Sequence, residues 1–326
     1  MKAISKPEVY RKGPFVYQNG SFFVGPAGGE HMNTNSLLRI CDLTSEEIFH
    51  ILEDAAVFSS SQSDWQFPRK TPIANLFFEP STRTQYSFQV AQAKLKMQSI
   101  NFNPVGSSLS KGESFYDTVK TFASFGVDAC VIRHVQNRYY DELQDLNIPI
   151  INAGDGTGDH PSQTLLDLYT IYKEFKHFQN LNILIVGDIL HSRVAHGGLD
   201  IMKRLGMNCY IASPDEYKDE TLGYPYVNLN DSIKDMDIIM LLRVQNERHQ
   251  EKNKITNEEY NRLYGLNMEK VALMKEQAII MHPAPFNRGV ELTDEVVECE
   301  KSRIFAQITN GVFVRQSILK RTFADE

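Results

Sequence analysis

The sequence predicts an α/β protein with two doubly wound domains, each built on a parallel sheet, and an active site between them. Short apolar segments alternate along the chain with amphipathic segments of helical period, as in repeated βα units. Several apolar segments are hydrophobic on both faces, which is typical of parallel strands covered by helices. A chain of 326 residues also has the usual length of two domains.

The apolar segments expected to be strands are residues 73–78, 129–133, 148–152, 183–186, 208–212, 238–242 and 278–281. Helical stripes predict helices over residues 84–97 and 164–172. Another helix is expected to begin where Thr44 or Ser45 precedes two glutamates, because this sequence can form a capping box. A last helix is expected from Gly311 onward.

The domain limits follow from this order of elements. Residues 1–33, rich in Gly, Pro and isolated aromatics, are expected to be a flexible N-terminal extension. The first domain is predicted over residues 34–161, completed by a C-terminal helix over 310–326. The second is predicted over residues 162–309, and within it the charged stretch 247–265 is expected to be a closing loop.

Composition narrows the class of partner. A formal net charge of −7 argues against general binding to nucleic acid or to acidic membranes. No apolar run reaches the ~18 residues of a membrane span, and the first residues lack the apolar stretch of a signal peptide. The four cysteines lack metal-binding spacing, and Cys130 and Cys209 sit in apolar runs as buried hydrophobes. We expect a cytoplasmic protein without nucleic-acid or membrane partners.

The sequence gives no sign of a cofactor. Asp155 and Asp188 have no His or carboxylate partners at ligand spacing, so no metal site is predicted. The turn at Gly187 and Asp188 also lacks the glycine pattern of a dinucleotide site. We predict neither a metal nor a redox cofactor.

The segment over residues 77–84 (FFEPSTRT) has the features of a phosphate site. A buried strand ends here, and Pro80 disfavours helix at the residue before it, so Ser81 stands where a helix N-cap belongs. A helix beginning there directs free N–H groups and the positive end of its dipole at a ligand. Ser81 and Thr82 alone would suit an ordinary capped helix, but Arg83 between two threonines favours an anion site.

This segment resembles the phosphate-binding signature of the aspartate and ornithine transcarbamoylase superfamily. The resemblance extends from about Ser36 to the C-terminus, and within the superfamily it favours the aspartate branch. Further matching motifs follow in family order at residues 111–114 (KGES), 131–134 (VIRH), 160–163 (HPSQ), 187–193 (GDILHSR), 243–245 (RVQ) and 282–285 (HPAP). This resemblance implies transfer of the carbamoyl group of carbamoyl phosphate to the amino group of L-aspartate, in de novo pyrimidine biosynthesis.

The resemblance assigns site residues. The catalytic residues implied are Arg83, Thr84, Lys111, Arg133 and His160. Those implied to bind carbamoyl phosphate are Ser81, Thr82, Arg83, Thr84, Ser107, Arg133, His160, Gln163, Ala284 and Pro285, the last two through backbone carbonyls. Those implied to bind aspartate are Lys111, Arg193, Arg243 and Gln245. Within the first set, Thr84, Arg133 and His160 are expected to donate hydrogen bonds to the carbonyl oxygen.

Several of these side chains also have structural roles open to them. Arg133 can form a buried ion pair, and a lone histidine such as His160 is more often structural than catalytic. The residues around Lys111 are typical of a solvated loop. Arg243 can form an ion pair with Glu247.

Two other functions stay open. One is transfer to ornithine or another amine, but that branch usually carries His-Cys-Leu-Pro where residues 282–285 read His-Pro-Ala-Pro. It also needs a carboxylate for the cationic side chain, where this chain has Arg243 and Gln245. The other is a non-catalytic scaffold, which the full set of site residues disfavours.

The resemblance also implies an assembly. The lysine loop reaches the site of a neighbouring subunit in this family, so a homotrimer with shared active sites is expected. The serine of this loop is assigned to Ser107, with Ser108 as the alternative register. A regulatory chain or other pathway enzymes are candidate further partners.

Overall fold

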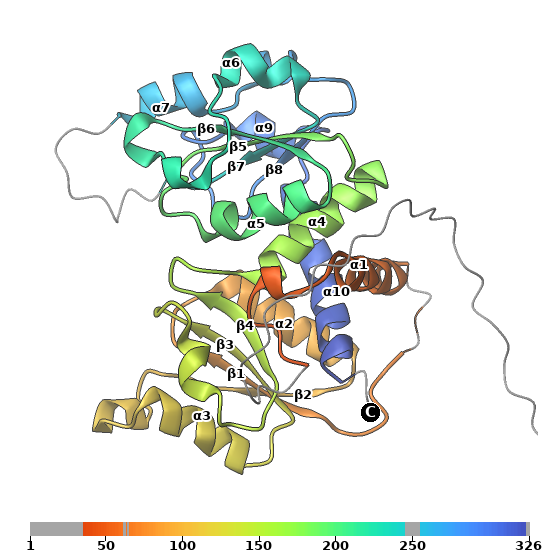
Figure 1. The fold of residues 1–326 in the computed structure, drawn as a ribbon, viewed down its shortest axis with the longest axis vertical. Coiled ribbons are helices and arrows are strands. Elements are labelled where there is room, and N and C mark those ends of the chain that lie inside the picture. The colour runs from red at the N-terminus through yellow and green to blue at the C-terminus, as the bar shows by residue number, and fades with distance from the viewer. Residues whose placement is uncertain (1–34, 61–62, 64, 245–254, 324–326) are drawn as a thin grey trace, which may run out of the picture. The chain divides into compact units, whose positions relative to one another are not determined.

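The computed structural model describes residues 35–60, 63, 65–244 and 255–323, and the structural statements below concern these residues. It contains two four-stranded sheets (Figure 1), whose orders are β2-β1-β3-β4 and β6-β5-β7-β8. All neighbouring strands are parallel. In each sheet the strand order reverses direction once, between β1 and β3 and between β5 and β7. Ligands of open α/β sheets bind at such switch points, outside the carboxyl ends of the strands.

The predicted strands are all present, some with shifted ends. Those of the first sheet are β1 (Pro72–Phe77), β2 (Gln98–Asn101), β3 (Ala129–His134) and β4 (Ile150–Asp155). Those of the second are β5 (Asn182–Val186), β6 (Asn208–Ala212), β7 (Ile238–Leu241) and β8 (Ile279–Met281). β2 was not predicted, because it is a short polar edge strand without a buried residue. β4 ends three residues beyond the predicted segment, after a register shift against β3.

The helices surround both sheets, with short 3-10 turns in several of the connections. The longer helices are α1 (Ser45–Ser59), α2 (Thr82–Lys94), α3 (Phe115–Ser124), α4 (Pro161–Phe175), α5 (Arg193–Arg204), α7 (Asn257–Tyr264) and α10 (Ile304–Thr322). The shorter ones are α6 (Leu229–Ser232), α8 (Met268–Val271) and α9 (Asp294–Glu298). The predicted capping box is confirmed, with Thr44 as the N-cap of α1 and Glu47 as its partner.

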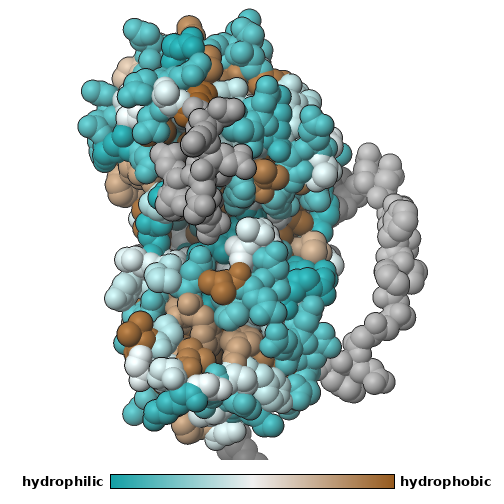
Figure 2. Space-filling view, turned by 90° about the vertical axis from the view of Figure 1, so that its left-hand side faces the viewer, coloured by the Kyte–Doolittle hydropathy of each residue, from teal (hydrophilic) through white to brown (hydrophobic). Residues whose placement is uncertain are grey.

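Each sheet is buried on both faces, as doubly wound sheets are. Along β1, Ile73 and Phe77 belong to the core that α1, α2, α4 and α10 cover, whereas Ala74 and Leu76 face the core of α3. In β5, Ile183 likewise belongs to the first of these cores, so one apolar cluster includes residues of both sheets. Figure 2 shows a mainly hydrophilic surface over the second sheet and apolar side chains gathered over part of the first.

Two predicted elements were wrong in their limits. The last helix begins at Ile304, seven residues before Gly311. Gly311 is an interior residue of α10 at a close approach to α4, since a Cβ there would lie 3.2 Å from Leu166 Cδ2. The expected closing loop over 247–265 contains helix α7, capped by the Thr256 side chain; residues 245–254 lie outside the described part.

Other expectations concern single residues and membranes. Cys130 and Cys209 are buried as predicted, and burial raises the pKa of each thiol to about 12. Among the described helices, none combines the length and apolar character needed to cross a bilayer.

Candidate active site

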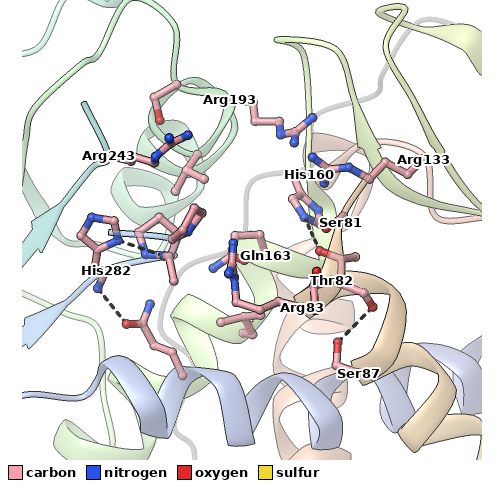
Figure 3. A pocket seen from close by; sticks show the side chains of 18 of the residues that line it. Ser81, Thr82, Arg83, Ser87, Arg133, His160, Gln163, Arg193, Arg243 and His282 are labelled. Carbon is pink, nitrogen blue, oxygen red and sulfur yellow. Dashed lines mark hydrogen bonds between the residues drawn. The ribbon is translucent and has the colours of Figure 1, made fainter. Parts of the chain in front are cut away.

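A cavity of about 560 Å³ opens where the switch points of the two sheets face each other. This volume is in the range of small-ligand sites. Most sequence-predicted site residues line it, and Figure 3 shows their side chains converging on it. They are Ser81, Thr82, Arg83, Thr84, Arg133, His160, Gln163, Arg193, Arg243, Ala284 and Pro285.

Three helices begin at this cavity. Ser81 is the N-cap of α2, His160 the N-cap of α4, and Ser192 the N-cap of α5. Ser192 caps its own helix through a side-chain hydrogen bond, whereas the Ser81 hydroxyl makes none to α2 and can serve a ligand. Free N–H groups and positive dipole ends therefore meet from three directions, which favours an anion.

Five arginines add positive charge to the same walls: Arg83, Arg133, Arg193, Arg243 and Arg315. Burial and the neighbouring Arg243 lower the pKa of Arg83. A guanidinium remains charged despite such shifts, and crowded like charges bind a multivalent anion strongly. The cavity is therefore built for a ligand with several negative charges.

Glu79 was not predicted as a site residue, although it stands in the phosphate segment. Among the described residues that line the cavity it is the one acidic side chain. Its Oε2 lies 2.9 Å from Arg133 Nη2 and 3.8 Å from Arg193 Nη2. The ion pair weighed as the structural role of Arg133 is thus present inside the cavity itself. The sequence did offer a sign of this role, because Glu79 stands at the end of a strand, directly before Pro80, in the phosphate segment.

A glycine lets two of the arginines approach the end of β4. Gly154 has a φ of +122°, and a Cβ there would lie 2.9 Å from Arg133 Nη1 and 3.1 Å from Arg193 Nη1. Arg133 Nη1 donates to the carbonyl of Ala153 at 3.2 Å, and Arg193 Nη1 donates to that of Gly156 at 2.9 Å. The two guanidiniums are therefore held side by side by backbone that only glycine fits well.

His160 is buried among cations. Burial first, and then Arg193, Arg133 and Arg315, lower its pKa well below the usual range of histidine. Its Nε2 lies 3.4 Å from Thr84 Oγ1, and its Nδ1 lies 3.5 Å from Ser162 Oγ. A neutral imidazole at this position can donate one hydrogen bond into the cavity, which is compatible with the oxyanion-donor role that the resemblance implies.

The turn after β8 forms the opposite wall. His282 accepts a hydrogen bond at Nδ1 from the backbone N–H of Ala284, at 2.9 Å. The backbone N–H of His282 donates to Oε1 of Gln307, on α10, at 2.8 Å. The pKa of His282 falls to about 3, because of burial and of the nearby Arg83 and Arg243. The turn is thus fixed from two sides by neutral hydrogen bonds.

His282 gives a pH-dependent stability that can be measured. The unfolded chain binds a proton at His282 near its ordinary pKa of about 6.5, but the folded protein does so only near pH 3. Because the unfolded state binds more protons in this window, the unfolding free energy falls as pH decreases from about 6.5 toward 3. Replacing His282 by Asn should remove about 1.4 kcal/mol per pH unit from this slope. Denaturant unfolding at several pH values measures it, and equal slopes would contradict the buried neutral histidine.

Two predicted site residues of the described part, Ser107 and Lys111, are not part of this cavity. Ser107 and Lys111 belong to a separate short 3-10 turn, where Ser107 is the N-cap and Lys111 is exposed. Neither is among the described residues that line the cavity. Gln245 lies outside the described residues, as does Glu247, the alternative partner of Arg243.

Comparison with protein families agrees with this geometry. A family model described as the carbamoyl-P binding domain of aspartate/ornithine carbamoyltransferase matches residues 35–173. A second, described as the Asp/Orn binding domain of the same proteins, matches residues 179–322. The chain belongs to the aspartate/ornithine carbamoyltransferase family.

Individual carbamoyltransferases are similar over most of the chain. The aspartate carbamoyltransferase catalytic subunit of Staphylococcus carnosus is 49% identical over 290 residues, or 89% of this chain and 96% of its own. Trypanosoma cruzi aspartate transcarbamoylase in complex with N-(phosphonacetyl)-L-aspartic acid gives a TM-score of 0.77 at 26% identity, covering 87% and 94% of the two chains. Its complex with carbamoyl phosphate and aspartate gives 0.77 at 26%, covering 87% and 95%.

Proposed function

We infer that this chain is an aspartate carbamoyltransferase. It transfers the carbamoyl group of carbamoyl phosphate to the amino group of L-aspartate and releases phosphate and N-carbamoyl-L-aspartate. The observation that carries this is one cavity in which five arginines and the beginnings of α2, α4 and α5 converge. Both substrates are anionic, and the similar Trypanosoma cruzi enzyme has been solved with carbamoyl phosphate and aspartate bound.

Carbamoyl transfer has three requirements that the site must meet. The uncharged amine attacks the carbamoyl carbon, an N–C bond forms, and the carbonyl oxygen becomes an oxyanion. The C–O bond to phosphate then breaks, phosphate leaves with the bonding electrons, and the proton lost by the amine passes to the leaving phosphate. The site must supply donors to the oxyanion, positive charge around the phosphate, and correct placement of the amine.

The phosphate half belongs at the start of α2. Ser81, Thr82 and Thr84 offer hydroxyl and backbone donors there, and Arg83 offers a fixed cation. The carbonyl oxygen would receive hydrogen bonds from Thr84, Arg133 and His160. Support for this grouping is the 3.4 Å separation of Thr84 Oγ1 from His160 Nε2. Neutral His160 can make this donation from the ring nitrogen that carries its one proton.

The amide half of the carbamoyl group needs acceptors. Gln163, Ala284 and Pro285 line the cavity, and the side-chain amide of the first and the backbone of the other two offer carbonyl oxygens. They would accept hydrogen bonds from the carbamoyl NH2.

Aspartate has two carboxylates, and arginine is the natural bidentate partner of each. Arg193 at the start of α5 would bind one, and Arg243 after β7 would bind the other, aided by Gln245 and by Lys111 of a neighbour. Ornithine fits less well, because the one acidic side chain among the described lining residues, Glu79, is already paired with arginines.

The assignment is tested by assaying phosphate release from carbamoyl phosphate with aspartate and, separately, with ornithine. Turnover with aspartate alone is expected. Turnover with ornithine alone would overturn the choice of substrate. Failure to bind carbamoyl phosphate in a calorimeter would instead favour a scaffold that has lost the chemistry.

We also propose a homotrimer in which each site borrows Ser107 and Lys111 from a neighbour. Neither residue is among the described residues that line the cavity of its own chain, which supports a role in the site of another. Exposed large apolar side chains nearby in the chain, such as Val105, Phe125 and Val135, are consistent with a protein interface there.

A mixing experiment measures this sharing. Chains with Lys111→Ala and chains with Arg83→Ala should each be nearly inactive alone. In randomly mixed trimers about one quarter of the sites combine an intact Arg83 with an intact neighbouring Lys111, so about a quarter of wild-type activity should return. Mixed trimers verified by mass spectrometry that stay inactive would count against shared sites.

Several wider expectations also remain proposals. Domain limits of 34–161 with 310–326, and 162–309, are supported by the two sheets and by the packing of α10 against α1, α2 and α4. The cytoplasmic location, the role in pyrimidine biosynthesis and a regulatory chain rest on the family resemblance.

A further inference from the structure

One buried carboxylate is connected by hydrogen bonds to both groups of carbonyl acceptors in the cavity, the Gln163 side chain and the turn after β8. Asp167 lies on α4 and is fully buried. Its Oδ1 accepts a hydrogen bond from Gln163 Nε2 at 2.9 Å and another from Gln307 Nε2 at 2.8 Å. Gln163 lines the cavity one helical turn earlier, and Gln307 comes from α10, 140 residues later in the chain.

These bonds fix which way each amide faces. An ionised carboxylate can only accept hydrogen bonds, so both glutamines must turn their NH2 groups to Asp167. The Gln163 carbonyl oxygen is then directed away from Asp167, and no described residue donates a hydrogen bond to it. Because Gln163 lines the cavity, this oxygen is available to a ligand with an N–H group.

Protonation of Asp167 does not reverse this orientation. Burial raises its pKa to about 7, opposed by the bonds from Gln307 and Gln163 and by nearby Arg315. Its Oδ2 is buried without a hydrogen-bond partner among the described residues. A proton would therefore bind at Oδ2, and Oδ1 would still accept from both glutamines.

The second branch of the network leads to the turn after β8. Gln307 uses its NH2 for Asp167, so its carbonyl oxygen faces the other way and accepts from the backbone N–H of His282 at 2.8 Å (Figure 3). His282 in turn holds the N–H of Ala284. Asp167 is thus connected by successive hydrogen bonds to the backbone that presents the Ala284 and Pro285 carbonyls.

We propose that Asp167 is a positioning residue that makes the cavity select a carbamoyl group over an acetyl group. It turns the Gln163 carbonyl toward the ligand and, through Gln307, fixes the turn whose carbonyls face the same NH2. A methyl group in place of that NH2 would leave these acceptors without a donor, and an unsatisfied buried acceptor is costly. The proposal rests on the carbamoyl-transfer function given above.

The test uses two stable ligands that differ only at this group. Phosphonoacetamide carries the NH2, and phosphonoacetone carries a methyl instead. Calorimetric titration of the wild-type protein should show about tenfold tighter binding of the amide. Asp167→Leu, which removes the acceptor at similar size, should bring the two affinities to within about twofold, with the affinity for inorganic phosphate nearly unchanged. Asp167→Asn keeps an oxygen at the Oδ1 position and should retain the preference.

A control variant on the same helix separates positioning from general damage. Thr170→Val removes a buried hydroxyl that accepts from Asn310 Nδ2 at 3.0 Å, away from the cavity, and should keep the preference. If Asp167→Leu does not fold, Gln307→Met cuts the second branch and should reduce the preference about threefold.

Each other outcome has a definite meaning. An unchanged preference in Asp167→Leu, or in Gln307→Met when only that variant folds, would overturn the proposal. Equal loss of both analogues and of phosphate in Asp167→Leu would also overturn it, as would a wild-type protein without preference. A wild-type protein that binds neither analogue would instead overturn the carbamoyl-transfer function.

Discussion

Replacing Arg83 by alanine is expected to lower kcat by about 10²–10³-fold, the loss typical of removing one group that stabilises transition-state charge. Arg83 stands in the first turn of α2, where the proposed mechanism places the leaving phosphate and its increasing negative charge. The hydroxyls of Ser81 and Thr82 and the helix dipole would remain, so weak binding of phosphate should survive. Steady-state kinetics and a phosphate titration measure the two effects.

A surface arginine provides the matched control. Arg288 is exposed, pairs with Asp294 and Glu298, and is not among the described residues that line the cavity. Arg288→Ala removes the same charge from the chain but should leave kcat within about twofold, because exposed ion pairs contribute little. Similar losses in both variants would mean that net charge, and not the α2 site, determines activity.

Arg243→Ala is expected to raise the KM for aspartate by about 10–10²-fold, the cost of one lost charge-assisted pair. Arg243 follows β7 at the switch point of the second sheet, on the wall opposite α2. The KM for carbamoyl phosphate should change much less, because the phosphate donors come from the first sheet. Arg243→Lys should restore activity only partly, since an ammonium cannot bind a carboxylate in the bidentate manner.

Initial rates over a grid of both substrates separate these constants. If the KM for carbamoyl phosphate rises as much as the KM for aspartate, Arg243 does not bind aspartate specifically. An unchanged KM for aspartate would show that residues other than Arg243 bind the carboxylates of aspartate.

Local pattern predicted the fold and the anion site at residues 81–84, whereas the family resemblance supplied most of the other candidate residues that line the cavity. Ser81 was placed at an N-cap from its neighbours in sequence alone, and α2 does begin after it. Gly311 misled the prediction of α10, because a helical glycine can serve close packing as well as a helix end. β2 was missed because a polar edge strand has no hydrophobic period.

Partners far apart in the chain were beyond the reach of pattern. The contact of Gln307 with Asp167 joins residues 140 positions apart, and each reads as an ordinary polar residue of a helix. The contact of Glu79 with Arg193 likewise depends on how the two sheets are placed, whereas Arg133, its other partner, comes from the strand beside β1. Such contacts need tertiary structure, because a side chain's partner is set by the fold and not by its sequence neighbours.

The central claim is that the start of α2 binds the leaving phosphate while Thr84, Arg133 and His160 bind the carbonyl oxygen beside it. A crystal structure with N-(phosphonacetyl)-L-aspartate tests it most directly, because this ligand joins mimics of both substrates. We predict the phosphonate at the backbone N–H groups of the first turn of α2 and the amide oxygen within hydrogen-bond distance of those three side chains. A phosphonate bound elsewhere, with the start of α2 empty, would contradict the account.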